Sequence, residues 1–202
     1  MRPSGPQHIQ RHAALFRTVG VATAQIQQLL RASLSTGEKV GKQGTRPLYA
    51  VEFDGRMLTV AVAVAANGHI LGANPNSLRL NGTTAGLTVQ NAGLPAEVRV
   101  AAEWGQHPLW IAGRYGAGNV TGPELGLSTE LWADLQTWAA AYDEGFNPSN
   151  PSASAPLPAG FTQRGYLLTV RVQKELGNGW TVAISDPESD DNIILPRLSA
   201  HH

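Results

Sequence analysis

The chain has 202 residues, of which 42% are hydrophobic and 15% charged, with 13 prolines, 22 glycines and no cysteine. This length allows one large domain or two small ones, and the glycine and proline content argues against a helical bundle. The lack of cysteine excludes disulfides and thiolate chemistry and fits the reducing cytosol. The longest strongly apolar run, residues 58–66, is far shorter than the roughly 20 residues of a membrane-spanning helix, so we expect a soluble, cytoplasmic protein without a membrane partner.

The net charge of zero conceals an uneven distribution along the chain. Residues 1–94 contain nine Lys and Arg against three Asp and Glu, which gives +6. Residues 95–202 hold the remaining six basic and twelve acidic residues, which gives −6. Such an asymmetry indicates that the halves have different partners or that each half is the partner of the other. Chance variation between two surfaces is the alternative.

The first half is predicted to contain two helices followed by an antiparallel meander. Residues 7–17 read as a short helix, and residues 22–35 as a second one whose Ile and Leu recur at three- and four-residue spacing. Asp-Gly and Asn-Gly pairs between β-rich runs are strong hairpin signals. We therefore expect a basic loop at residues 38–47 and then three strands at residues 48–53, 57–66 and 69–73.

The second half is predicted to form a hairpin, two helices and further strands. Its clearest helix is residues 126–145, with Ser128 as N-cap and an apolar stripe facing the core. The other expected elements are strands at 97–104, 108–113 and 180–185, a Pro/Ser loop at 146–160, a helix at 162–176, and an acidic tail that is either disordered or adds a strand at 192–195.

The fold class predicted from these elements is α+β, with two small domains that each pack helices on an antiparallel sheet. The segment rich in Asn, Gly and Thr that separates the halves indicates a linker, with the boundary near Gly93. The expected division is residues 1–80, a linker at 81–95, and residues 96–202.

Residues 8–12 read HIQRH and place two histidines four residues apart on one face of the predicted first helix. Such a pair can begin a metal site, but the glutamate of the H-E-x-x-H pattern is missing and His69 is the only other imidazole in this half. Two imidazoles and a nearby arginine also suit metal-free RNA cleavage by general acid–base catalysis. A solvated helix surface is the third alternative. We expect neither a metal nor a cofactor.

The segments IQRH at residues 9–12, QIQQLLRASL at 25–34 and NGHILGANP at 67–75 together resemble bacterial polymorphic and contact-dependent inhibition toxins. These toxins belong to the superfamily of barnase, EndoU, colicin and RelE-type ribonucleases. The resemblance covers residues 6–77 and implies a cleavage site between the N-terminal helix and the last strands, with RNA, tRNA above all, as substrate. It also implies delivery of the toxin part into neighbouring cells.

The resemblance, together with the positive charge of this half, points to two sets of candidate residues. The catalytic candidates are His8, Arg11, His12, Arg17, His69 and Asn74. The candidates for binding the RNA backbone are Lys39, Lys42, Arg46 and Arg56.

The second half contains no pattern typical of catalysis. Its runs VRVAAEW, ELGLSTELWADLQTWAAAYD and VQKELGNGWTV resemble small actinobacterial proteins encoded beside toxins, which are thought to be immunity proteins. The resemblance covers residues 97–185 and implies a domain whose work is binding. Acidic residues around the predicted helix are then candidates for the surface that meets a toxin, although a solvated helix face explains them equally well. These candidates are Glu124, Glu130, Asp134, Asp143 and Glu144.

Together the two resemblances predict a toxin–immunity module on one chain, in which an acidic immunity-like domain neutralises a metal-independent ribonuclease-like domain. The contact between the two parts can be intramolecular or between copies. The alternative is a non-catalytic immunity protein that captures a separate toxin. A two-domain protein unconnected with toxins remains a third hypothesis.

Overall fold

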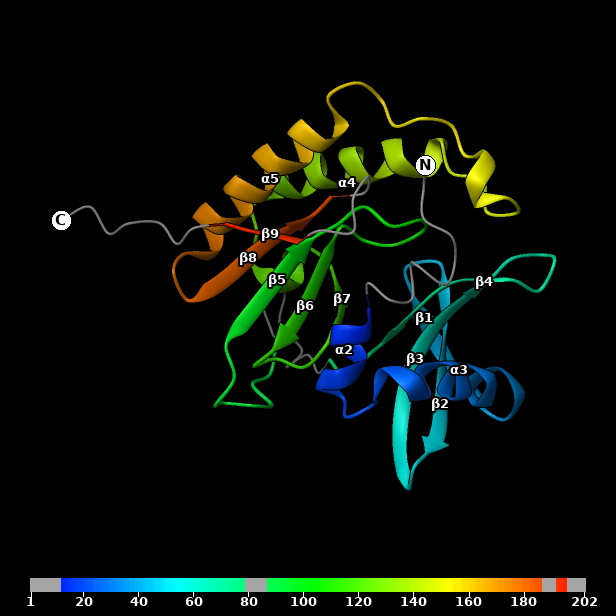
Figure 1. Ribbon diagram of the computed structural model, residues 1–202. Coiled ribbons are helices and arrows are strands. Elements are labelled where there is room, and N and C mark those ends of the chain that lie inside the picture. Colours follow the sequence, from blue (N-terminus) through cyan, green and yellow to red (C-terminus); the bar gives the residue numbers. More distant parts are fainter. Residues whose placement is uncertain (1–11, 79–86, 187–191, 196–202) are drawn as a thin grey trace.

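The computed structural model describes residues 12–78, 87–186 and 192–195. The described chain folds into two sheets with helices packed on each, which confirms the α+β class (Figure 1). We call residues 12–78 the N-terminal unit and the described residues from 87 onward the C-terminal unit. Among the described residues, no helix combines the length and apolar character needed to cross a membrane.

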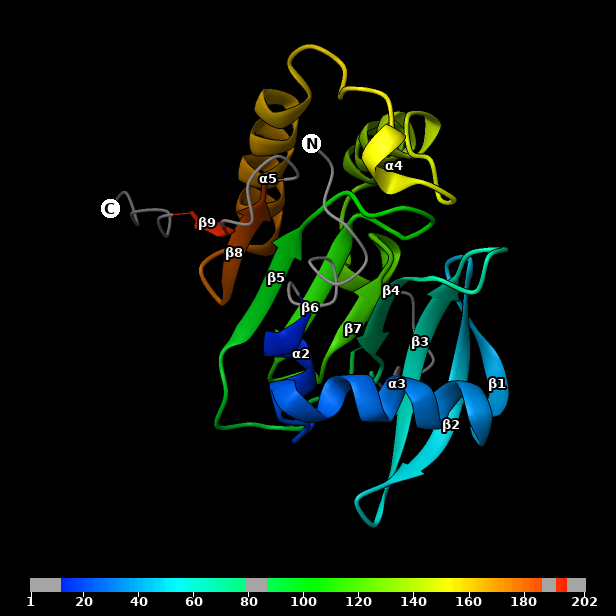
Figure 2. The ribbon, with the colours of Figure 1, turned by 45° about the vertical axis from the view of Figure 1, so that its right-hand side comes forward.

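The N-terminal unit is a four-stranded antiparallel meander with two helices and a 3-10 turn. Its elements are α2 (Ala13–Thr18), η1 (Thr23–Gln25), α3 (Ile26–Ser35), β1 (Glu38–Gln43), β2 (Arg46–Phe53), β3 (Arg56–Val64) and β4 (Ile70–Pro75). The strands follow chain order across the sheet. Figure 2 shows α3 lying across the strands. Its apolar stripe, including Leu29 and Leu30, buries against Val60 and Val62 of β3.

The opposite face of this sheet carries the polar side chains of interest. In the antiparallel register Leu48, Ala61 and Asn74 lie opposite one another on β2, β3 and β4. Side chains two residues apart on a strand share a face, so Arg46 lies on this face too. Asn74 and Arg46 are nevertheless buried. The part of this face around Arg46 and Asn74 is therefore covered and not exposed to water.

The basic segment at residues 38–47 was predicted to be a loop, and this is wrong. Residues 38–43 form β1, which pairs with β2 and has a bulge between Lys39 and Gly41. Five of its six residues are exposed, so this strand at the edge of the sheet has no alternation of apolar and polar residues to reveal it. Edge strands are often charged in this way, which protects them from pairing with other chains.

The C-terminal unit is a five-stranded sheet with two long helices. Its elements are β5 (Ala96–Val100), β6 (Leu109–Gly113), β7 (Gly118–Val120), η2 (Pro123–Leu125), α4 (Thr129–Glu144), η3 (Pro151–Ala153), α5 (Phe161–Leu176), β8 (Trp180–Ser185) and β9 (Asn192–Ile194). The strand order is β7-β6-β5-β8-β9. The Ser128 hydroxyl accepts a hydrogen bond from the Leu131 amide, which confirms the predicted cap of α4. Residues 192–194 do add a strand, which pairs with β8.

One strand pair of this sheet departs from the antiparallel arrangement predicted. β5 and β8 run parallel, because the chain between them passes through α4 and α5 on one face of the sheet and re-enters in the same direction. Glycine in α5 allows the two helices to approach closely. A Cβ atom at Gly165 would lie 2.6 Å from the Trp138 ring.

The two faces of β6 join different parts of the molecule. Leu109 and Ile111 point into the core under α4 and α5. Trp110, between them, points to the other face and packs with Leu15 of α2, together with Ala101 and Ala117. Helix α2 lies beside β6 (Figure 2). Its Phe16 belongs to the core of the N-terminal unit, and its Leu15 belongs to the small separate cluster around Trp110.

Candidate site, a buried polar cluster between the two units

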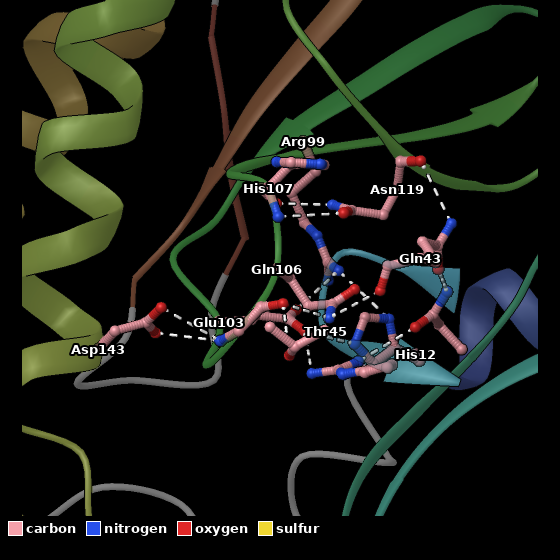
Figure 3. Close-up of polar contacts among 12 residues, drawn as sticks. His12, Gln43, Thr45, Arg99, Glu103, Gln106, His107, Asn119 and Asp143 are labelled. Carbon is pink, nitrogen blue, oxygen red and sulfur yellow. Dashed lines mark hydrogen bonds and ion pairs between the residues drawn. The ribbon is translucent and has the colours of Figure 1, made fainter. Parts of the chain in front are cut away.

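A cluster of polar side chains lies where the sheet of the N-terminal unit meets the loop after β5. Figure 3 shows side chains of both units pointing into this region. Its centre is the carboxylate of Glu103, which is 2% exposed. We define the polar cluster by its seven main members, which are His12, Gln43, Arg46 and Asn74 of the N-terminal unit and Arg99, Glu103 and Trp110 of the C-terminal unit.

The Glu103 carboxylate contacts cationic or ring nitrogens of three side chains. Its Oε2 lies 2.9 Å from His12 Nε2 and 3.5 Å from an Arg46 guanidinium nitrogen. Its Oε1 lies 3.4 Å from Arg99. Because His12 and Arg46 are 0% and 2% exposed, these contacts are shielded from water and salt. Charged groups are buried in this way only where partners compensate the loss of hydration.

His12 is held in place by its backbone and by an aromatic neighbour. It precedes the first residue of α2 and its carbonyl accepts from the Phe16 amide at 2.9 Å. Its ring lies 4.7 Å from that of Trp110, centroid to centroid. The Arg99 guanidinium nitrogen that contacts Glu103 also lies 3.5 Å from Nδ1 of the His12 ring. A guanidinium cannot accept a hydrogen bond, so this arrangement assigns the ring proton to Nε2, which donates to the carboxylate.

Arg46 begins β2 and extends into the cluster. It donates to Asn74 Oδ1 at 3.1 Å, and its Cζ lies 5.8 Å from the centroid of the Trp110 ring. Burial lowers the pKa of the Arg46 guanidinium, and the attraction of Glu103 opposes that decrease. Arginine has so high an ordinary pKa that the group stays charged at neutral pH. Glu103 is therefore the partner that most favours a buried charge at this position.

Amide side chains extend the network to the edge of the C-terminal sheet. Asn74 donates to Gln43 Oε1 at 2.6 Å, and Gln43 in turn donates to the carbonyl of Asn119 on β7 at 3.2 Å. The side chain of Asn119 donates to two carbonyls, those of His107 and Leu109. These contacts fix the amides that orient Arg46.

Two tight turns dock against each other beside the cluster. The amide and hydroxyl of Thr45, in the β1–β2 turn, both donate to the carbonyl of Gly105 at 3.0 Å. Gly44 and Gly105 have φ values of +56° and +66°, and neither has room for a side chain. The amide of Gly105 also donates to the carboxylate of Asp143 at the end of α4. The loop that carries Glu103 is thus anchored on both sides.

The structure brings three of the predicted N-terminal residues together, namely His12, Arg46 and Asn74. The first and last of these are separated by 62 positions in the sequence. His69 is exposed in the β3–β4 turn, and Arg17 is exposed on α2. Neither belongs to the polar cluster. His8 and Arg11 lie outside the described residues.

The predicted RNA-binding cations other than Arg46 are at the surface. Lys39 and Lys42 are exposed on β1, at the edge of the sheet. Arg56 is exposed at the start of β3 and donates to the carbonyls of Val19 and Gly20, which ties the end of α2 to the sheet.

The predicted acidic interface residues divide into two groups. Glu130 and Asp134 of α4 form ion pairs with Arg171 of α5, and the hydrogen bond to Asp134 raises the pKa of Arg171. Glu124 accepts from the amide and hydroxyl of Thr121 within its own turn. These three carboxylates therefore have their partners within the C-terminal unit.

The other two acidic candidates lie at the end of α4. Asp143 holds the Glu103 loop through Gly105, and Glu144 is exposed. Asp143 therefore contacts the loop that carries Glu103, beside the polar cluster.

Sequence reasoning missed Glu103, Arg99 and Trp110. The signal was a single carboxylate in the run VRVAAEW, where every other residue except Arg99 is apolar. A charged residue inside a buried run requires a partner of opposite charge. What the sequence did not reveal is that two of the partners come from residues 12 and 46.

The arrangement of His12, Arg46 and Asn74 is suited to a negatively charged oxygen. An imidazole can transfer a proton, a guanidinium can stabilise developing negative charge, and an amide can orient the guanidinium. Within the described part of the chain, no group of three or more His, Asp or Glu side chains is placed to hold a metal ion. The fold and the cluster together define a two-part α+β protein with a buried ionic contact between its parts.

Comparison with known families bears on one of the two units. The model of a family described as Serratia CdiI immunity protein-like matches residues 96–187. The matched stretch runs from the start of β5 to just beyond β8, so it includes Arg99, Glu103 and Trp110 and stops short of the N-terminal unit. The C-terminal unit is therefore similar to immunity-type proteins. No curated protein matches the chain.

Proposed function

We propose that the chain is a toxin–immunity module, in which residues 96–202 bind and neutralise a metal-independent ribonuclease-type domain formed by residues 1–80, with a linker between them. The similarity of residues 96–187 to CdiI immunity proteins supports the binding role of the second domain. The ribonuclease role of the first domain rests on the chemistry of its buried side chains and on its resemblance to toxins.

The observation that carries the proposal is the position of Glu103. The immunity-like unit places this one carboxylate between His12 and Arg46, the two groups of the N-terminal unit that suit RNA cleavage. An inhibitor of a nuclease needs to present negative charge where the enzyme binds phosphate. In the proposed module Glu103 does this, and RNA is excluded while the two units remain docked.

The proposed catalytic roles follow from the geometry around His12. His12 transfers the proton of the 2′-hydroxyl or of the leaving oxygen, and Arg46, oriented by Asn74, stabilises the phosphorane charge. His8, Arg11, Arg17 and His69 remain candidates for the second proton transfer and for substrate contacts. The exposed Lys39 and Lys42 are placed to contact the backbone of an RNA, with tRNA as the proposed substrate class.

The alternative is an immunity protein without catalysis that captures a separate toxin. It is favoured by the family match, which lies wholly in residues 96–187 and by itself requires binding alone. The two candidates differ in what they predict for the first 80 residues.

The test is to express residues 1–80 in bacteria alone and with residues 95–202 supplied as a separate chain. The module predicts growth arrest and RNA cleavage by residues 1–80, loss of both in His12→Ala, and rescue by residues 95–202. Arg31→Ala, at an exposed position of α3, is the matched control and should leave cleavage intact. Residues 1–80 that fold and bind residues 95–202 without cleaving RNA would leave the binding-only alternative.

A further inference from the structure

We infer that His12, Arg46 and Arg99 form an oxyanion site that binds the phosphate group of a phosphodiester, and that Glu103 is an internal occupant of this site. The identity of the phosphodiester as RNA rests on the proposed function. The oxyanion site itself rests on the contacts of the described residues.

The two carboxylate oxygens of Glu103 are shared between donors of the two units. One oxygen faces donors of the N-terminal unit, at 2.9 Å from His12 and 3.5 Å from Arg46. The other faces Arg99 of the C-terminal unit at 3.4 Å. The two non-bridging oxygens of a phosphodiester present the same pair of acceptors to the same donors. Arginine and histidine are well suited to such oxygens.

The hydrogen bonds that position Arg46 lie within the N-terminal unit and do not involve Glu103. Arg46 is positioned by Asn74, and Asn74 by Gln43, through hydrogen bonds of 3.1 and 2.6 Å within that unit. The chain thus places a guanidinium and an imidazole close together in a nearly dry region. The buried guanidinium is stable there only with an anion beside it, because uncompensated buried charge is costly, and the imidazole adds a donor to the same anion.

Trp110 supplies a further hydrogen-bond donor on a ring that packs against His12. Trp110 is 1% exposed, its ring packs against His12, and its Nε1–H has no hydrogen-bond partner in the part of the chain that the structure describes. Arg46 and Arg99 each have Cζ 5.8 Å from the centroid of this ring. A buried donor without an acceptor is rare in folded proteins. Trp110 therefore adds an unused donor to the side chains that surround the cluster.

The oxyanion site can be reached from solvent. A groove of about 240 Å³ runs beside α2 and is lined by Arg99 and Trp110, with Leu15, Thr18 and Ala112 among its other walls. An anion can therefore approach Arg99 from solvent without separation of the two sheets. A longer RNA is excluded from the assembled site, and if the units part it meets only His12 and Arg46, without Arg99.

The experiment uses the full chain with Glu103→Ala, which removes the carboxylate and leaves space for about the volume of inorganic phosphate. Binding of phosphate is measured by calorimetry and by thermal denaturation, against chloride at equal ionic strength. We expect phosphate at 100 times its Kd to raise the Tm of Glu103→Ala by about 5–10 °C. Phosphate stabilises folded proteins in general relative to chloride, so the Tm of the unaltered chain and that of Glu52→Ala, an exposed carboxylate on β2, should rise by the same smaller amount.

Adding Arg46→Met to Glu103→Ala should abolish the phosphate effect. If phosphate raises the Tm of Glu103→Ala no more than that of the unaltered chain, the oxyanion site is refuted and Glu103 is a structural ion-pair partner only. If Glu103→Ala fails to fold in chloride, its folding in phosphate becomes the readout, and failure in both salts also refutes the site.

A DNA trinucleotide, which lacks the 2′-hydroxyl, separates the two sources of phosphate. Its binding to Glu103→Ala, and its displacement by inorganic phosphate, identify a phosphodiester as the ligand. Binding of phosphate without the trinucleotide would overturn the phosphodiester assignment and leave a site for free phosphate. Neither result depends on RNA cleavage, so failure of the ribonuclease proposal would be seen separately, as intact RNA in the presence of a working oxyanion site.

Discussion

The docking of the two turns predicts a specific effect of a methyl group at residue 105. Gly105 has φ of +66°, and an added Cβ would overlap the hydroxyl of Thr45, which with the Thr45 amide donates to the Gly105 carbonyl at 3.0 Å. Gly105→Ala therefore combines a backbone cost of about 1–2 kcal/mol for the left-handed conformation with the loss of two hydrogen bonds, about 1 kcal/mol each.

The matched control is Gly55→Ala in the β2–β3 turn. Its φ of +71° imposes the same backbone cost, but an added Cβ has no atom within 4 Å. We expect Gly105→Ala to lose about 3–4 kcal/mol of unfolding free energy and Gly55→Ala about 1–2 kcal/mol. For a chain of this length the difference corresponds to about 4–8 °C in Tm, measured by circular dichroism.

A second substitution separates the contact from the backbone. Thr45→Ala removes the overlapping hydroxyl, so in the Gly105→Ala background it should recover part of the lost stability, although in the unaltered chain it destabilises. Such a reversal of sign is the signature of a direct contact in a double-mutant cycle. Equal Tm values for Gly105→Ala and Gly55→Ala, or additive effects with Thr45→Ala, would refute the docking of these turns.

Three further predictions concern the core and the charged groups. Glu103→Gln should lower the free energy of unfolding, measured by urea denaturation, by about 3–5 kcal/mol, because it leaves the buried Arg46 without its carboxylate. An unchanged urea midpoint would contradict the ionic contact. Burial lowers the pKa of His107, so the folded state resists protonation of this group, and the free energy of unfolding falls as the pH drops below the unfolded pKa of about 6.5. His107→Gln should make the free energy of unfolding fall less between pH 7.5 and 5. Parallel curves of unfolding free energy against pH for the two proteins would contradict this. Gly165→Ala should destabilise by about 1–2 kcal/mol, since overpacking against Trp138 exceeds the gain in helix propensity, and a rise in Tm would show that the helices can separate.

The elements that the sequence predicts well are those with a strong local pattern. The periodic stripe and Ser128 cap of α4, and the Asp-Gly and Asn-Gly turns around β3, each determine an element through neighbouring residues. β1 was missed because its side chains are exposed and carry no alternation, and β7 because three residues are too few to show a period. The parallel pairing of β5 with β8 depends on the path of the chain over α4 and α5, which no local pattern encodes.

The polar cluster shows the same limit in the chemistry. His12, Arg46 and Asn74 were selected for their residue types, and register places two of them on one sheet face, since Asn74 pairs with Ala61 and Ala61 with Leu48. The acidic candidates named from the sequence lie in and around α4. Glu103 was overlooked because it is a single carboxylate in an apolar run, and burial, which gives it its effect, is a property of the assembled units.

The most direct test of the central claim is a titration of RNA cleavage by residues 1–80 with residues 95–202. The toxin–immunity module predicts cleavage of tRNA by residues 1–80, complete inhibition at one equivalent of residues 95–202, and inhibition at least 100-fold weaker for residues 95–202 carrying Glu103→Gln, as expected for about 3 kcal/mol of lost contact. Cleavage that continues in excess of residues 95–202, or inhibition equally strong with Glu103→Gln, would contradict it.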